Sequence, residues 1–144
     1  MAKTCASSNL RRIARLVTRH YDRYLEPTGV TATQLPILAA IGAEMGESIS
    51  HLAEILGIER STLSRDLNVL RRKGLVESRP GADERVQRLA TTAKGSHVLH
   101  EAHKAWERAH TELMDVASDL PKNIRDLRKL ESSIAHLPSF DVDD

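Results

Sequence analysis

Basic and small hydroxyl side chains cluster in the middle of this 144-residue chain. Arginine binds phosphate and pairs with guanine edges, asparagine pairs with adenine, and small hydroxyl residues allow a close approach to the DNA. Between positions 60 and 72 the candidate DNA-binding residues are Arg60, Ser61, Thr62, Ser64, Arg65, Asn68 and Arg72. The cluster predicts a surface that binds the phosphates and base edges of double-stranded DNA.

A second basic group follows between positions 79 and 88. Arg85 lies in a turn-forming segment, and an arginine on a narrow hairpin fits the minor groove, where the potential is most negative. Asp83 can accept hydrogen bonds from that guanidinium and fix its direction. Arg79 and Arg88 are expected to contact phosphates. The alternative is a solvated hairpin with a surface ion pair, which stabilises a fold little.

The charge is unevenly distributed, although the formal net charge is only +1. Residues 60–88 contain eight arginines and lysines against four acidic residues, which indicates a polyanionic partner. Aromatic residues make up 3% of the chain. This low content argues against the proteins that stack single-stranded bases on several aromatic rings.

The sequence favours a protein that is not an enzyme and uses no cofactor. It has no spaced nucleophile, base and orienting group and no glycine-rich phosphate loop. Its longest uncharged apolar run, residues 35–43, is far shorter than the ~20 residues of a membrane helix, so we expect no membrane association. There is no apolar leader before Arg11, and the chain has one cysteine. We therefore expect a cytoplasmic protein.

Two further groups of residues could sense a signal. Cys5 lies near Lys3 and before an arginine-rich segment, and positive surroundings lower the pKa of a thiol and favour its oxidation. Histidines three or four residues apart on a helix can share a metal ion, and four of them are close in the sequence: His97, His100, His103 and His110. The alternatives are an unreactive thiol and solvated histidines, and we expect no bound metal.

Apolar periodicity places the basic cluster on a helix. Leu63, Leu67 and Leu70 form one apolar stripe within a helix at about 60–73, and Gly74 can end that helix in a left-handed conformation. Three helices are expected before it: one at about 8–25, one at about 35–41 after a capping box from Thr31 to Gln34, and one that Ser48 or Ser50 caps and Gly57 ends.

A hairpin and two long helices are expected to follow. Strands at 75–79 and 86–91 flank a turn, and helices at about 92–118 and 121–137 come after it. The last helix has apolar residues at nearly coiled-coil spacing, and such an exposed stripe indicates a homodimer interface. The chain is thus predicted to be a single, mainly α domain: a winged helix-turn-helix with a two-stranded β-wing. Its DNA-binding lobe is expected at about 31–91 and its dimerisation helices at about 8–26 and 92–137.

The order and spacing of these segments resemble the MarR family of bacterial multiple-antibiotic-resistance-type regulators, over roughly residues 10–137. The matching segments are Leu52–Ile58, Ser61–Arg65, Leu70–Val76, the Asp83–Glu84–Arg85 wing signature, Thr92–Gly95 and Thr31–Gln34. Three positions depart from the family pattern: Thr91 replaces the usual leucine, Glu59 replaces a serine-type cap, and Pro36 lies in a helix that normally lacks proline.

The resemblance implies a homodimer that reads successive major grooves of a pseudo-palindromic operator. It also implies repression that is relieved by a small ligand, often an aromatic anion, in a pocket between the dimerisation helices and the DNA-binding lobe. Arg15, His20 and Tyr24 are the candidate residues for that pocket. Two alternatives remain: a DNA-binding regulator that responds to redox state through Cys5 or to a metal, and a winged-helix module that binds an acidic protein.

Overall fold

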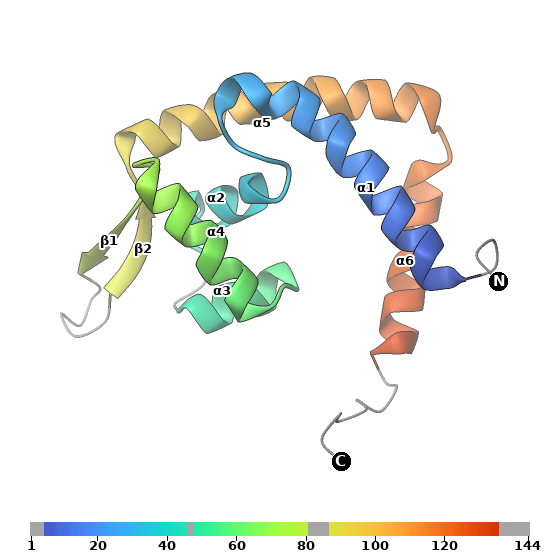
Figure 1. Cartoon of the computed structure of the whole chain (residues 1–144), viewed down its shortest axis with the longest axis horizontal. Helices are drawn as coiled ribbons and strands as arrows, with labels where there is room; N and C mark the ends of the chain where they lie inside the picture. Colours follow the sequence, from blue (N-terminus) through green and yellow to red (C-terminus); the bar gives the residue numbers. More distant parts are fainter. Residues whose placement is uncertain (1–4, 46–47, 81–86, 136–144) are drawn as a thin grey trace, which may run out of the picture. The chain divides into compact units, whose positions relative to one another are not determined.

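The computed structural model describes residues 5–45, 48–80 and 87–135 of the chain (Figure 1). The chain divides into two compact units, Met1–Ala109 and His110–Asp144. The elements in order are α1 (Ala6–Leu25), the short 3-10 helix η1 (Glu26–Thr28), α2 (Gln34–Gly42), α3 (Ile49–Leu56), α4 (Arg60–Arg72), β1 (Val76–Pro80), β2 (Gln87–Thr91), α5 (Ala93–Val116) and α6 (Leu120–Ile134). The fold is mainly α, as the sequence predicted.

The strands β1 and β2 form the expected antiparallel hairpin after α4. Val76 lies opposite Thr91, and the register continues to Pro80 opposite Gln87. The hairpin tip, with the wing residues Asp83 and Arg85, lies outside the described residues.

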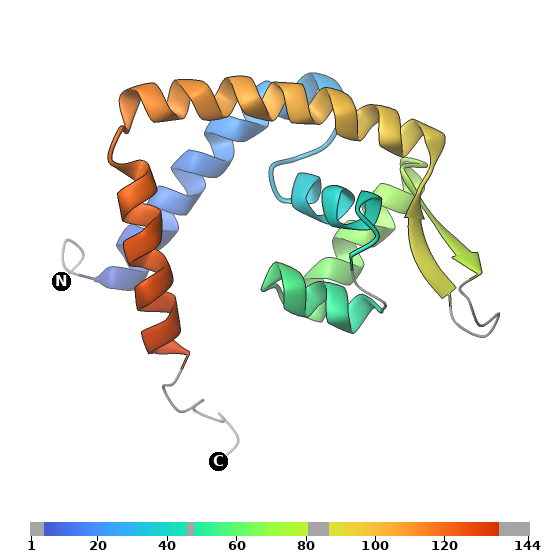
Figure 2. The same cartoon turned by 180° about the vertical axis from the view of Figure 1, so that it is seen from behind.

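Leucine side chains of α4 form the centre of the core in the first unit. Leu63, Leu67 and Leu70 are at most 1% exposed, so the apolar stripe predicted from their spacing is confirmed. They belong to one buried cluster with residues of α2, α3 and β1. Figure 2 shows α2 and α3 beside α4 in this unit. Burial of one face of α4 leaves its opposite face for a partner.

Left-handed glycines end two of the helices, as predicted. Gly57 follows α3 with φ 63°, and Gly74 follows α4 with φ 69°. After α4, the N–H of Leu75 donates to the carbonyl of Leu70 at 3.0 Å, which closes the helix end. Glycine adopts this conformation without the steric cost that a Cβ atom brings.

One helix of the lobe, α3, begins with a side-chain cap, whereas the N-cap residue of α2, Thr33, makes no capping hydrogen bond. Ser48 accepts a hydrogen bond from the N–H of His51 at 3.1 Å at the start of α3. Thr31 accepts one from the N–H of Gln34 at 3.3 Å before α2. The second half of the predicted capping box differs, because the Gln34 side chain accepts a hydrogen bond from Lys73 at 3.3 Å instead. That buried amide therefore links α2 to the end of α4.

Thr92 and Gly95 join the end of α4, the start of β1 and the start of α5. The Thr92 hydroxyl donates to the Gly74 carbonyl at 2.7 Å and accepts from the Gly95 N–H at 2.9 Å. A Cβ atom on Gly95 would lie 2.0 Å from the carbonyl oxygen of Leu75. This threonine–glycine pair therefore allows α5 to begin directly against the backbone of Leu75, the residue before β1.

Several helices carry exposed apolar side chains. In α1, Leu10, Ile13 and Leu16 are 38–54% exposed. In α6, the exposed stripe consists of Ile124, Leu127, Leu130 and Ile134. The apolar face predicted for α5 is buried at Ala102, Ala105 and Ala109 but not at Val116, which is 79% exposed. None of the described helices is long and apolar enough to cross a membrane.

Candidate nucleic-acid interface

The basic cluster lies on the part of the α4 surface that its buried leucine stripe leaves uncovered. The residues of this cluster that are exposed are Arg60, Ser61, Thr62, Arg65, Asn68 and Arg72. Ser64 is partly buried. The structure therefore brings the residues predicted from the sequence onto one helix, with most of their side chains accessible to a partner.

Hydrogen bonds within α4 set the roles of two of these side chains. The Ser64 hydroxyl donates to the Arg60 carbonyl at 2.8 Å, so its proton is already used and its oxygen remains an acceptor. The Nε–H of Arg65 donates to the Ser61 carbonyl at 3.4 Å. Because a guanidinium has five N–H groups, this contact can hold the Arg65 side chain against the helix while its terminal nitrogens bind an acceptor.

The residue at the N-cap position of α4 does not cap the helix with its side chain. Glu59 occupies the N-cap with an extended backbone, and its side chain makes no capping hydrogen bond. The first N–H groups of a helix lack intrahelical partners and attract anions such as phosphate. The uncapped end favours a phosphate contact, although the Glu59 carboxylate opposes it.

The two arginines of the hairpin lie directly opposite each other. Arg79 on β1 pairs in register with Arg88 on β2. Like charges at such positions destabilise a sheet, and an anion would relieve the repulsion. Arg79 also forms an ion pair with Glu77 at 2.6 Å, which the sequence analysis did not predict. Arg88 has no ion pair within the described part of the chain, so it carries the less compensated charge.

Arg71 connects α4 to the hairpin. Its Nη2 atom donates to the Ser78 hydroxyl at 3.3 Å. Lys73, which follows α4, connects this helix to the residue after η1, because its Nζ atom donates to the Gly29 carbonyl at 2.6 Å. From the sequence both residues contribute only positive charge, because their partners are distant in sequence or on another element.

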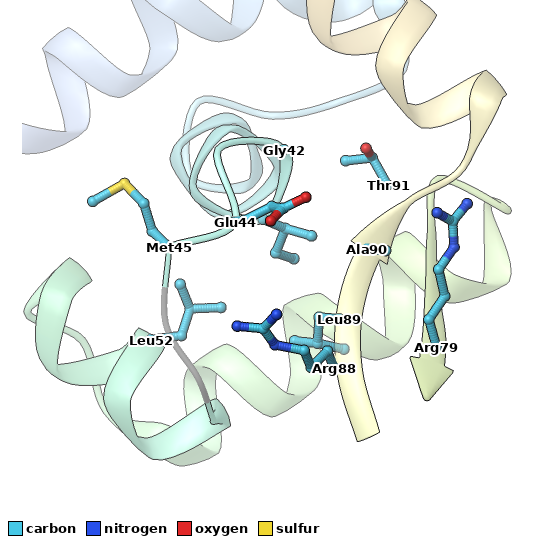
Figure 3. Close-up of a pocket in the computed structure, with 10 residues that line it drawn as sticks. Gly42, Glu44, Met45, Leu52, Arg79, Arg88, Leu89, Ala90 and Thr91 are labelled. Atoms are coloured by element: carbon cyan, nitrogen blue, oxygen red, sulfur yellow. The ribbon is translucent and has the colours of Figure 1, made fainter. Parts of the chain in front are cut away.

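Two cavities flank this lobe. The wing-base cavity, of about 250 Å³, is lined by Ile41, Gly42, Glu44, Met45, Leu52, Arg79, Arg88, Leu89, Ala90 and Thr91 (Figure 3). The apolar cavity, of about 380 Å³, is lined by Tyr21, Ala32, Leu35, Pro36, Ala39, Leu99, His103 and Trp106. Pro36, which departs from the family pattern, thus forms part of a cavity wall.

Stacked rings line one side of the apolar cavity. The rings of Tyr21 and Trp106 are 6.3 Å apart and nearly parallel, and His103 stacks on Trp106 at 5.9 Å. Burial raises the pKa of the Tyr21 hydroxyl, so this ring stays neutral around pH 7. The cavity therefore offers flat aromatic surface, with His103 as a basic side chain beside it.

Of the three candidate ligand residues, His20 and Tyr24 are in contact, with ring centroids 5.5 Å apart, but the three do not line one cavity together. Arg15 is exposed on α1. His20 contacts the Ala109 carbonyl through Nε2 at 2.7 Å, and since a carbonyl only accepts, Nε2 carries the proton. Tyr24 lines a third cavity of about 270 Å³, together with Pro27, Thr28, His97, Val98, Glu101, Ala105 and Arg108. Tyr21, the neighbour of His20, lies at the apolar cavity instead.

The candidate sensing residues differ in their surroundings. Cys5 is exposed at the start of α1, and hydrogen bonds from the Ser8 side chain and backbone lower the pKa of its thiol. His103 lies 3.5 Å from Glu107. The described residues contain no group of three side chains placed to hold a metal ion.

Comparison with known proteins identifies the family. The MarR family model matches residues 28–85. The chain is 39% identical to the M. tuberculosis transcriptional regulator MosR, solved in complex with DNA, with a TM-score of 0.79 over 92% of this chain and 99% of that one. The chain belongs to the MarR family. The resemblance found in the sequence is confirmed, and this MarR-family protein is a DNA-binding transcriptional regulator rather than an enzyme.

Other solved structures share the MarR fold. MosR solved alone is 35% identical, with a TM-score of 0.81 over 95% of this chain and all of that one. The S. aureus MepR–DNA complex is 20% identical, with a TM-score of 0.76 over 93% of this chain and 99% of that one. At that lower identity the match shows the fold alone, and it confirms the winged helix-turn-helix architecture.

Proposed function

We propose that this MarR-family protein is a cytoplasmic repressor that binds a pseudo-palindromic operator as a homodimer and releases it when a small effector binds. The observation that carries the proposal is the two-sided α4, with buried leucines on one face and exposed basic and hydroxyl residues on the other. A helix of this kind enters the major groove, and the half-sites of a dimer then lie about 34–36 Å apart.

The proposed DNA contacts divide by role. Ser61, Thr62, Ser64, Arg65 and Asn68 contact base edges or nearby phosphates in the major groove. Arg60 and Arg72 neutralise phosphates near the two ends of α4, and Arg79 and Arg88 do so from the hairpin. Asp83 and Arg85, outside the described residues, are proposed to reach the minor groove as an oriented arginine.

The exposed apolar residues of α1 and α6 support a homodimer. In the apolar stripe of α6, for example, Leu127 and Leu130 are 44% and 42% exposed. Burying apolar surface drives association, and a symmetric pair of identical chains is the commonest way to cover such a stripe.

The apolar cavity is the proposed effector site. Its wall of Tyr21 and Trp106 suits a flat aromatic ring, and His103 is its one basic side chain. This lining favours an aromatic effector with little charge over the aromatic anion that the family resemblance suggested. An effector there releases DNA only if it binds more tightly to a form of the protein that fits the operator poorly.

A second trigger is favoured by one observation. The Cys5 thiol has a lowered pKa and is exposed, which are the properties of an oxidisable thiol. Peroxide should release DNA from the natural chain but not from Cys5→Ser if oxidation is the trigger. Release that is unchanged in Cys5→Ser would exclude this trigger.

Arg65→Ala tests the major-groove proposal. The affinities for a duplex from the upstream region of the protein's own gene and for a random duplex are measured by fluorescence anisotropy. Loss of a base contact should reduce the difference in binding free energy between the two duplexes by about 1–3 kcal/mol. Equal losses on both duplexes would show that Arg65 contacts only phosphate and would contradict its role in reading sequence.

A further inference from the structure

The wing-base cavity combines an apolar floor with opposite charges at its rim. Ile41 and Leu52 are 2% and 1% exposed and form the floor with the half-buried Leu89. Glu44 and Arg88 are both exposed and line the same cavity. An apolar cavity of about 150 Å³ holds benzene, so a cavity of 250 Å³ has room for a somewhat larger molecule.

The two charges at this rim have no ion-pair partner in the described part of the chain. Neither Glu44 nor Arg88 forms an ion pair there, whereas Arg79 is paired with Glu77. In Figure 3 the Arg88 side chain extends from β2 toward Leu52, and Glu44 lies above it at the end of α2. Within the described ranges, a negative and a positive group without an ion-pair partner thus line one cavity.

The backbone of Glu44 is in a conformation that favours glycine. Its φ of 54° is left-handed, and it is the one such non-glycine residue among those described. The N–H of Met45 donates to the Ala40 carbonyl at 2.8 Å, so Glu44 occupies the position after α2 where glycine is usual. A strained backbone at a cavity is a sign that the side chain itself has a function. Here that side chain is a carboxylate.

We infer that the wing-base cavity binds a small dipolar molecule with an apolar body, the chemistry of a free apolar amino acid. Its carboxylate accepts paired hydrogen bonds from the Arg88 guanidinium, which suits a planar carboxylate. Its ammonium group pairs with Glu44, and its apolar body covers Ile41 and Leu52. This site is separate from the apolar cavity, with which it shares no lining residue.

Titration of the full chain with L-leucine, followed by two-dimensional ¹H–¹⁵N NMR, tests the inference. The backbone amides of Glu44, Met45 and Leu89 should shift and saturate. Two analogues, 4-methylpentanoate and isopentylamine, each keep one charge and should bind at least about fivefold more weakly, because one charge-assisted contact is lost. Absence of saturable shifts at these amides, or equal affinity for all three probes, would overturn the inference.

Glu44→Gln provides the matched variant, because it keeps the size of the side chain and removes only its charge. It should lower the affinity for L-leucine about fivefold and leave that for 4-methylpentanoate unchanged. Glu54→Gln, at an exposed site on α3 that does not line the cavity, is the control and should change neither affinity. Equal loss of L-leucine binding in both variants, or no loss in Glu44→Gln, would refute the role of the Glu44 carboxylate.

Discussion

At the scale of single residues, Glu59 limits both the stability of α4 and its attraction for phosphate. It occupies the N-cap without a capping hydrogen bond. Glu59→Ser supplies a hydroxyl acceptor and removes a negative charge, so we expect the free energy of unfolding to rise by about 0.5–1 kcal/mol and DNA affinity to rise as well. Urea denaturation and anisotropy measure the two effects, and lower stability with weaker DNA binding would contradict this account.

Cys5 should titrate differently in the folded and unfolded chain. Hydrogen bonds from Ser8, then from the backbone of Ser7, lower the pKa of its thiol. A lowered pKa means that the thiolate forms at a lower pH in the folded state. The rate of reaction with a disulfide reagent should therefore reach half its maximum at a lower pH for the folded chain than for the chain in urea. Coincident midpoints would show that the folded N-terminus does not stabilise the thiolate.

The two arginines of the hairpin should differ in their share of DNA binding. Arg79 is already paired with Glu77, whereas Arg88 has no ion pair among the described residues. Arg88→Ala should reduce the salt slope of binding by about 0.9, the value for one phosphate contact, and Arg79→Ala by less. Anisotropy over a salt series measures both slopes, and a larger effect at Arg79 would reverse the assignment.

At the scale of elements, Gly95 determines how closely α5 approaches β1. Its Cβ would lie 2.0 Å from a backbone oxygen that cannot rotate away, so Gly95→Ala should destabilise the fold by about 2–3 kcal/mol. Gly42→Ala is the matched control. Its nearest contact is the end of the Leu99 side chain at 2.9 Å, which can move, so the loss should be smaller. Equal losses of unfolding free energy would show that the contact with β1 is not what requires glycine.

The elements themselves could largely be predicted from the sequence, because their signals are local. The Leu63, Leu67 and Leu70 stripe, the left-handed Gly74 and the Ser48 cap each depend on residues within one helix or its ends. Contacts between distant segments could not be predicted in this way. Lys73 donates to Gln34, 39 residues earlier, and the requirement for Gly95 arises from a backbone oxygen on another element.

The candidate site was predicted in part for the same reason. The basic and hydroxyl residues of α4 remain outside the core because helical periodicity places Leu63, Leu67 and Leu70 together on the buried face. Of the effector residues proposed from α1, His20 and Tyr24 lie in contact, with ring centroids 5.5 Å apart, but neither His20 nor Arg15 lines a cavity described above. A cavity is formed by several elements at once, so residues of one helix do not define it. The apolar cavity includes Pro36, which departs from the family pattern, and Trp106, for which no local sequence signal indicates a cavity.

At the scale of the whole molecule, the exposed stripe of α6 should control assembly. Leu127→Glu places a charge within this stripe, so we expect the natural chain to sediment as a dimer and this variant as a monomer. Arg128→Glu, at the neighbouring exposed position outside the stripe, is the control and should remain dimeric. A monomeric natural chain, or a dimer that persists in Leu127→Glu, would contradict the proposed interface.

The central claim is that this MarR-family protein recognises duplex DNA of a preferred sequence through α4 and the hairpin. The most direct test is fluorescence anisotropy over a salt series, with the duplex from the upstream region of its own gene and with a random duplex. The account predicts tight binding to the upstream duplex, weaker binding to the random one, and an affinity that falls steeply as salt rises. Absence of salt-dependent binding to either duplex would contradict it and would favour an acidic protein as the partner of this basic face.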